Sequence, residues 1–212
     1  SDFGEMTRLA KIAKPDTCVI TNIGTCHLEN LGDRDGVLKA KTEIFQYVKK
    51  NIVLNGDDDK LSTVKEYNGI QPVFFGNGEN CVVICENVES RGLKGMSCDI
   101  CIKGELAENG EEERFHVEIP MPGRHMVANA LAAAAIGRLY GLTAAQIKAG
   151  IESLEPVSGR FHMIETEKFM IVDDCYNANP MSMKASLDVL QDGLGRKVAI
   201  LGDMGELGAD EV

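Results

Sequence analysis

Lys41 stands out because the helical period around it turns a charged side chain toward the protein interior. Residues 33–49 have the pattern of a helix, with Asp33 or Asp35 as its cap. The inward stripe consists of Val37, Ala40, Lys41, Ile44 and Val48. Two interpretations are open. The lysine extends its aliphatic stem along the edge of the core, or burial favours the neutral amine for a role in an active site.

His27 lies just after a short apolar run, residues 17–23, which is typical of a buried parallel strand and is followed by Gly24. Loops at the carboxyl ends of parallel strands are where α/β proteins bind ligands. A neutral imidazole in such a loop can bind a metal ion. The alternative is an ordinary solvated loop histidine.

Four other polar segments are candidates for chemistry or for turns. Residues 122–125, Pro-Gly-Arg-His, offer a glycine turn and free backbone N–H groups for an anion or nucleotide, or simply start a helix. Residues 173–180, Asp-Asp-Cys-Tyr-Asn-Ala-Asn-Pro, place two carboxylates and two amides at a strand end, and Asx-turn capping explains only part of this cluster. Residues 202–208 predict a glycine-rich turn, and residues 57–59, three aspartates, predict a solvated turn.

The elements that position these residues alternate between strand and helix in the first third of the chain. Strands are predicted at 17–23, 51–54 and 72–75, with helices at 33–49 and 60–67, which indicates βαβ units and a parallel sheet. From 81 to 119 apolar residues alternate with others and Asn109-Gly110 is a hairpin signal, so an antiparallel meander is expected. Helices are predicted at 126–140 and 143–154.

A linker is predicted at residues 155–159, where proline, serine and glycine interrupt the pattern. Strands at 161–167, 169–172 and 197–201 and a helix at 182–190 then form another α/β unit. The fold class is therefore α/β, a mainly parallel sheet with an antiparallel meander followed by a Rossmann-like second domain. We expect domains at 1–156 and 157–212, the second truncated at Val212, with an incomplete and more mobile sheet.

Composition excludes several classes of protein. The formal net charge of −11 over 212 residues argues against nucleic-acid binding, and no apolar run approaches the roughly 20 residues of a membrane span. The start at Ser1 lacks the pattern of a signal peptide. Seven cysteines, an odd number, indicate reduced thiols in a cytoplasm. The spacing of Cys81, Cys85, Cys98 and Cys101 superficially suits zinc, but alternating strand faces favour buried thiols.

Five ordered segments, spanning nearly the whole chain, resemble the Mur ligase family. Residues 21–32, Thr-Asn-Ile-Gly-Thr-Cys-His-Leu-Glu-Asn-Leu-Gly, are similar to its segment with a metal-binding histidine, and residues 39–45, Lys-Ala-Lys-Thr-Glu-Ile-Phe, to the one whose lysine becomes carbamylated. Residues 123–129 resemble its Gly-x-His-Asn-x-x-Asn stretch, with Met126 where asparagine is usual. Residues 174–180 and 201–208 favour the branch that adds D-alanyl-D-alanine.

This resemblance implies a Mur-ligase-type central domain and the start of a C-terminal domain, with ATP, Mg²⁺ and peptide substrates. ATP would phosphorylate the carboxylate of a UDP-N-acetylmuramoyl-tripeptide, and the amine of D-alanyl-D-alanine would attack the acyl phosphate. Two Mg²⁺ ions and a cationic shell are expected. The implied catalytic residues are Lys41, His27 and Arg160, of which His27 and carbamylated Lys41 would bind one Mg²⁺.

The nucleotide contacts are also implied by the resemblance. Asn129 would contact the adenine, Arg160 the phosphates and Asp174 the ribose, while Asn177 and Asn179 belong to the same binding motif without a clear division of roles.

The phosphate loop is the main element that the resemblance requires and the sequence lacks. No GxxxxGK[ST] pattern occurs in the 212 residues, so the loop is expected upstream, and the chain alone is expected to be an inactive fragment with at best weak ATP binding. The intact protein would be a cytoplasmic, monomeric enzyme of peptidoglycan precursor synthesis. The alternatives are a sibling Mur ligase, a folate polyglutamate synthetase, or a nucleotide-binding module without catalysis.

Overall fold

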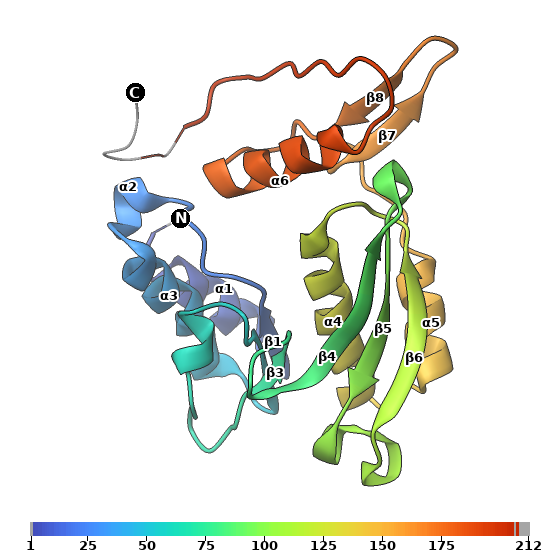
Figure 1. Cartoon of the computed structure of the whole chain (residues 1–212). Coiled ribbons are helices and arrows are strands. Elements are labelled where there is room, and N and C mark those ends of the chain that lie inside the picture. Colours follow the sequence, from blue (N-terminus) through green and yellow to red (C-terminus); the bar gives the residue numbers. More distant parts are fainter. Residues whose placement is uncertain (1, 206, 208–212) are drawn as a thin grey trace.

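The main sheet has six strands in the order β1-β2-β3-β4-β5-β6 (Figure 1). In this computed structural model, residues 2–205 and residue 207 are described. β1 to β4 pair in parallel, and β4, β5 and β6 pair antiparallel. This confirms the predicted parallel sheet with an antiparallel meander. The strands are β1 (Thr17–Ile20), β2 (Asn51–Asn55), β3 (Val73–Phe75), β4 (Cys81–Ser90), β5 (Met96–Ile102), β6 (Glu113–Ile119), β7 (His162–Glu165) and β8 (Met170–Asp173).

The helices lie mainly where the apolar periodicity predicts them. The helix predicted at 126–140 is α4, and the one predicted to open at Thr143 is α5, which Thr143 caps through the backbone N–H of Gln146. The helices are α1 (Glu5–Ala13), α2 (Leu28–Leu31), α3 (Arg34–Thr42), α4 (Arg124–Leu139), α5 (Ala144–Glu152) and α6 (Pro180–Gln191).

Two apolar clusters cover the two faces of the parallel half. In β2, Val53 joins the cluster under α4, while its neighbours Ile52 and Leu54 join the cluster under α3, because successive strand residues point to opposite faces. All three side chains are fully buried. A continuous apolar run with no polar face is what a strand covered on both sides requires.

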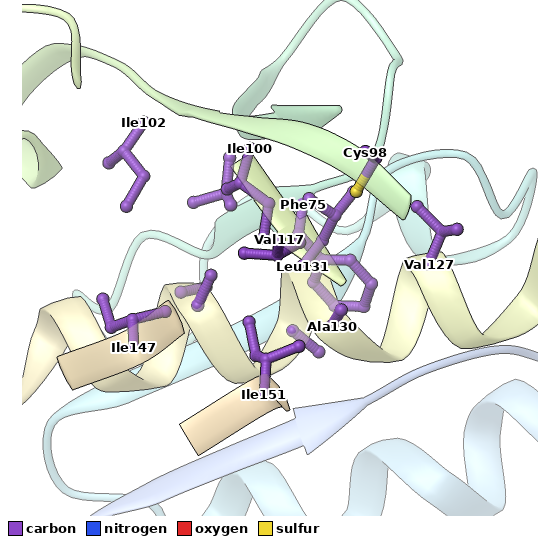
Figure 2. Packing of buried hydrophobic residues seen from close by; sticks show 14 of the residues in the cluster. Phe75, Cys98, Ile100, Ile102, Val117, Val127, Ala130, Leu131, Ile147 and Ile151 are labelled. Atoms are coloured by element: carbon purple, nitrogen blue, oxygen red, sulfur yellow. The ribbon is translucent and has the colours of Figure 1, made fainter. Parts of the chain in front are cut away.

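The larger cluster lies between the meander and helices α4 and α5 (Figure 2). Ile100 of β5 and Val117 of β6 lie near Leu131 of α4 in this cluster, and Ile102 of β5 lies on the side of Ile147 of α5 (Figure 2). Small alanines on the inner side of α4 let the helix approach the sheet closely. This core holds the first unit of the chain together.

The cysteines of the meander are strand thiols, as predicted. Cys81 and Cys85 lie in β4 and Cys98 and Cys101 in β5, and all but Cys85 are buried. Burial raises the pKa of Cys98 to about 12, which keeps it a neutral thiol in the core.

Helix α3 is capped as predicted, since Asp33 accepts a 2.9 Å hydrogen bond from the backbone N–H of Gly36. The α-helix is shorter than the predicted 33–49, because it tightens into a 3-10 helix over Glu43–Tyr47. Val37 is fully buried in its inner stripe, whereas Lys41 is half-buried. Lys41 therefore lies at the border of the core.

Helix α1 was not predicted, and Glu43 ties its start to the segment after α3. The carboxylate of Glu43 accepts bonds from the backbone N–H of Gly4 at 2.8 Å and from the hydroxyl and N–H of Thr7 at 2.9 and 3.1 Å. Burial acts to raise the pKa of Glu43, but these bonds and the charge of Lys39 lower it below its usual range.

Two predicted elements are wrong. The helix predicted at 60–67 is only a 3-10 turn at Leu61–Thr63, because Asp58 caps the amides of Lys60 and Leu61 and the chain then turns back at a Tyr67–Ile70 bridge. The strand predicted at 197–201 does not form. Ile200 is 95% exposed there, and within the described residues no strand pairs with this segment.

The second unit consists of the antiparallel β7–β8 hairpin and α6, which matches the predicted strands and helix before residue 191. Its hairpin keeps Ile164 and Ile171, which pair with each other, 41% and 42% exposed. Without the strand at 197–201, the described part forms no Rossmann-like parallel sheet. Of the glycine-rich stretch 202–208, Glu206 and Gly208 lie outside the described residues.

The two units meet at the tip of the β4–β5 hairpin, which reaches α6 (Figure 1). Ser90 at this tip donates a 3.2 Å bond to Asp192 at the end of α6.

None of the helices within residues 2–205 is long and apolar enough to cross a membrane.

Candidate functional site

The loop that follows β1 is held by side chains from the next elements of the chain. Asn55, at the end of β2, donates a 2.9 Å hydrogen bond to the carbonyl of Thr21. Lys41 donates a 2.9 Å bond from Nζ to the carbonyl of Asn22. The ammonium of Lys41 thus lies against the loop that leads to His27. That Lys41 and His27 bind one Mg²⁺ together, as the family resemblance implies, remains a prediction.

Ile23 is the most firmly held residue of this loop. Its N–H donates a 2.7 Å bond to Oδ2 of Asp58, and its carbonyl accepts a 2.9 Å bond from Nε of Arg34. The same guanidinium binds both carboxylate oxygens of Asp59, at 3.0 and 2.5 Å, and lowers the pKa of Asp59 below its usual range.

Residues 57–59 form the predicted turn, in which Asp57 and Asp59 are exposed, but the prediction that the turn is solvated is wrong for Asp58. The side chain of Asp58 is 8% exposed and accepts bonds from the loop and from its own turn. Asp57 accepts bonds from the backbone N–H groups of Asn77 at 2.7 Å and Gly78 at 2.8 Å. The bonds of Asp58 to Lys60 and Leu61 are local, but its bond to Ile23 spans 35 positions, so the sequence gave no signal that Asp58 is buried.

His27 lies at the start of α2 with a left-handed backbone, φ 57°. It lines a small cavity of about 20 Å³ between the first and second units. The predicted site residues in this cavity are His27, Asn177 and Asn179. The complete lining is Thr25, Cys26, His27, Asn177, Ala178, Asn179, Gly205 and Leu207. Three segments that are far apart in sequence therefore meet around one imidazole and two amides.

The two asparagines differ in what their side chains already do. Asn179 is the cap of α6: its Oδ1 accepts a 2.9 Å bond from the N–H of Ser182, and Pro180 occupies the first helical turn. Asn177 accepts a 2.9 Å bond from the N–H of Ala178. The capping explanation for part of the 173–180 cluster is therefore confirmed for Asn179.

The carboxylates at the end of β8 hold the linker between the units. Asp173 accepts a 3.0 Å bond from the N–H of Gly159, and Asp174 accepts a 3.1 Å bond from the N–H of Phe161. Asp174 also accepts a bond from the hydroxyl of Ser186 in α6. These bonds hold the residues around Arg160, the end of β8 and helix α6 together.

Arg160 follows the linker and lies between Gly159 and Phe161, whose N–H groups donate to Asp173 and Asp174. Its guanidinium carbon is 3.8 Å from the centre of the Tyr176 ring, a close cation–π contact. Both side chains are exposed. Arg160 is thus pre-oriented by stacking and still accessible to an anionic ligand.

Asn129 lies on α4 and its amide contacts Met126, the residue that departs from the family pattern, at 3.5 Å from the sulfur. The cavity around His27 is not lined by Asn129, Lys41, Arg160 or Asp174, as far as the described residues go. The structure therefore brings together only part of the predicted set. Sequence reasoning missed Arg34 and Asp58. It also missed the cavity residues Thr25 and Cys26, whose only signal was that they directly precede His27 in the sequence.

Comparison with known proteins places both units in one family. The family model described as Mur ligase middle domain matches residues 1–137, and that described as Mur ligase, glutamate ligase domain matches residues 159–211. The UDP-N-acetylmuramoyl-tripeptide–D-alanyl-D-alanine ligases of Escherichia coli K12 and Bacillus subtilis 168 are each 35% identical, over 98% and 97% of the chain. The chain spans 45% and 43% of their lengths, less than half.

Solved structures agree with this assignment. A crystal structure of MurF from Acinetobacter baumannii has a TM-score of 0.86 and 32% identity, covering 99% of this chain and 45% of that one. The MurF ligase of Thermotoga maritima in complex with ADP has a TM-score of 0.79 and 29% identity, covering 99% of this chain and 47% of that one.

Proposed function

The chain belongs to the Mur ligase family, and we propose that it is the middle domain and the beginning of the C-terminal domain of the enzyme that joins D-alanyl-D-alanine to UDP-N-acetylmuramoyl-tripeptide with ATP. The observation that carries this proposal is the 35% identity to two ligases of that name over 97–98% of the chain, across both units. We place the boundary between the domains at residues 156 and 157, within the linker whose last residue, Gly159, donates its N–H to Asp173.

The reaction divides into two steps. The terminal carboxylate of the tripeptide attacks the γ-phosphorus of ATP, giving an acyl phosphate and ADP. The amine of D-alanyl-D-alanine then attacks the acyl carbon, and the tetrahedral intermediate expels inorganic phosphate as the peptide bond forms. Both steps gather negative charge, so catalysis depends on positioning and on neutralising cations.

In this proposal Lys41 and His27 act at the metal. The residues that the structure describes contain no group of three or more histidine, cysteine or carboxylate side chains arranged to hold a metal ion. An unmodified ammonium is not a ligand, but a carbamate on Lys41 would supply the oxygen atoms that Mg²⁺ prefers. Bound Mg²⁺ would neutralise phosphate charge, which matters in a chain of formal charge −11.

Arg160 and Asp174 would contact the nucleotide from the second unit, and Asn129 would contact the adenine from α4. Stacking on Tyr176 supports the role of Arg160, because a pre-oriented guanidinium loses less freedom when it binds a phosphate. Asp174 already holds Phe161 and Ser186, so a ribose hydroxyl would use its remaining acceptor sites. Asn177 and Asn179 would face the ligand from the cavity around His27.

Assays of the full-length enzyme test the proposal. With ATP and UDP-N-acetylmuramoyl-tripeptide, phosphate release should depend on D-alanyl-D-alanine and not on single amino acids. Activity with a single amino acid alone would instead identify a sibling ligase.

A second test compares two lysines of the same helix. Lys41→Ala should reduce activity about a hundredfold or more, and a short carboxylic acid in the buffer should restore part of it, since it replaces the missing oxygen ligands. The control is Lys39→Ala, which changes an exposed residue of α3 and should leave activity nearly unchanged. Equal activities of the two variants would contradict the role of Lys41.

The isolated chain should have no ligase activity and at best weak affinity for ATP, because it lacks the phosphate-loop pattern. Calorimetry of the chain with ATP measures this, and micromolar or tighter binding would contradict it. We further propose that the intact enzyme is a cytoplasmic monomer, for which size-exclusion chromatography gives the oligomeric state.

A further inference from the structure

The turn that carries Arg160 has an unusual backbone, which side chains at the end of β8 hold in place. Gly159 and Phe161, on either side of Arg160, both have left-handed backbones, with φ of 74° and 50°. Such a backbone is rare for an aromatic residue and persists only where surrounding contacts fix it. Here Asp173 accepts the N–H of Gly159 at 3.0 Å, and Asp174 accepts the N–H of Phe161 at 3.1 Å. The backbone at Arg160 is therefore fixed from both sides.

Tyr176 extends from a segment that is bonded to the same turn. Its N–H donates a 3.1 Å bond to the carbonyl of Gly159. The centre of its ring lies 3.8 Å from the guanidinium carbon of Arg160. Tyr176 is 70% exposed, so its ring contributes little to the apolar core. Because the two backbone segments are bonded together, the two side chains have only their own torsions to lose when they stack.

Stacking on a ring orients the guanidinium of Arg160 without using its N–H groups. A guanidinium carries five N–H donors in its plane, and a ring on its face leaves all five free. A carboxylate would instead take up two of these donors and offset the charge. Within the described part of the chain, Arg160 forms no ion pair, and the nearby carboxylates of Asp173 and Asp174 accept backbone N–H groups. Tyr176 thus orients a cation that keeps its donors for an anion.

We propose that Tyr176 is a positioning residue, whose ring holds the guanidinium of Arg160 in the orientation that binds the phosphate groups of the nucleotide. This inference rests on the proposed function, in which Arg160 contacts those phosphates. A guanidinium that is already oriented loses less freedom on binding, so the stacking should increase the affinity for ADP. An exposed cation–π contact corresponds to a factor of about two to five in affinity, and to more when the bound ligand excludes water from it.

The test is a double-mutant cycle in the full-length ligase, with the Kd of ADP in the presence of Mg²⁺ measured by calorimetry, which needs no turnover. Tyr176→Ala should raise the Kd about three- to tenfold. Arg160→Ala should raise it about tenfold or more, because charged hydrogen bonds to phosphate are lost. In the Arg160→Ala background, Tyr176→Ala should change the Kd by less than about twofold, since no guanidinium is left to orient.

Two further variants of Tyr176 separate the ring face from side-chain bulk. Tyr176→Phe keeps the face and should recover the affinity to within about twofold of wild type, whereas Tyr176→Leu should lose as much as Tyr176→Ala. The matched control is Phe169→Ala, which removes another exposed aromatic ring of the second unit, 62% exposed, and should leave the Kd within about twofold of wild type. Thermal unfolding should give a Tm for Tyr176→Ala within about 2 °C of wild type.

A Kd of Tyr176→Ala and Tyr176→Leu within twofold of wild type would overturn the positioning role. Equal losses from Tyr176→Ala with and without Arg160 would also overturn it, because the ring would then contact the nucleotide directly. A wild-type enzyme that binds ADP but forms no product with D-alanyl-D-alanine would contradict the proposed function instead, and the ADP titrations of the variants would still decide on Tyr176.

Discussion

Replacing Ile100 by alanine should strongly destabilise the first unit. Ile100 is fully buried in β5, opposite Cys85 of β4 and Phe115 of β6, and it packs in the core beneath α4. The substitution removes three carbon atoms, worth about 2.4 kcal/mol at about 0.8 kcal/mol each. The remaining cavity adds to this, so the total loss should be about 3–4 kcal/mol.

The measurement is thermal unfolding followed by circular dichroism, with urea unfolding as a second estimate. For a chain of this size each kcal/mol lowers the Tm by about 2–4 °C, so the expected decrease is roughly 6–16 °C. The control is Ile164→Ala in β7, where the side chain is 41% exposed and should cost only about 1 kcal/mol. Equal decreases for the two variants would refute the reasoning that the core lies in the first unit.

Three further predictions follow from charge, thiol burial and the sheet edge. The bonds of Glu43 lower its pKa in the folded state. Its contribution to the free energy of unfolding is therefore fully present above the pKa of the unfolded state, and it is lost as the pH falls through the lower pKa of the folded state. Urea unfolding should therefore show Glu43→Gln less stable than wild type at pH 7, with the difference shrinking as the pH falls below the ordinary pKa of a glutamate. Alkylation followed by mass spectrometry should modify the exposed Cys175 in the native protein and Cys98 only after unfolding, and native labelling of Cys98 would contradict its burial. In the edge strand β6, a backbone C=O accepts a 2.6 Å bond from Lys148 of α5, and a backbone N–H donates a 3.0 Å bond to Glu152 of the same helix. Replacing both side chains by alanine exposes this edge and should promote dimerisation, which light scattering measures. A variant that stays monomeric would show that other features protect the edge.

The hydrogen exchange of the second unit offers a comparison with the first. Its hairpin exposes Ile164 and Ile171, and residues 197–201 form no strand, whereas β1 pairs with β2 and buries Cys18 and Ile20. Faster exchange in β7 and β8 than in β1 is therefore expected.

Elements with a strong local pattern were predictable. β2 is a continuous apolar run, α4 has an alanine-rich helical period, and Asp33 and Thr143 are caps whose partners lie three residues away. These signals depend on neighbours in sequence, so no knowledge of the tertiary structure is needed. The failure at 197–201 has the opposite cause, since a strand forms only where another strand pairs with it.

The candidate site was predictable as a set of residues but not as an arrangement. The helical period placed Lys41 at the edge of the core, and the strand-end rule placed His27 in a ligand loop, both from the sequence. The chain alone could not show that Lys41 reaches the carbonyl of Asn22, or that Asn177 lies beside His27. The first contact joins residues 19 positions apart, which the folding of the first unit brings together. The second joins residues 150 positions apart, which only the packing of the two units brings together.

The aspartates at 57–59 also show which features the sequence predicts and which depend on the fold. By itself the sequence determined a polar turn after β2, because three acidic residues disfavour a strand. Only the tertiary structure decided that Asp58 is buried and binds Ile23, whereas Asp59 stays at the surface with Arg34. The physical reason is that a carboxylate can be buried only where distant backbone N–H groups and a guanidinium compensate its lost hydration, and their positions depend on the whole fold.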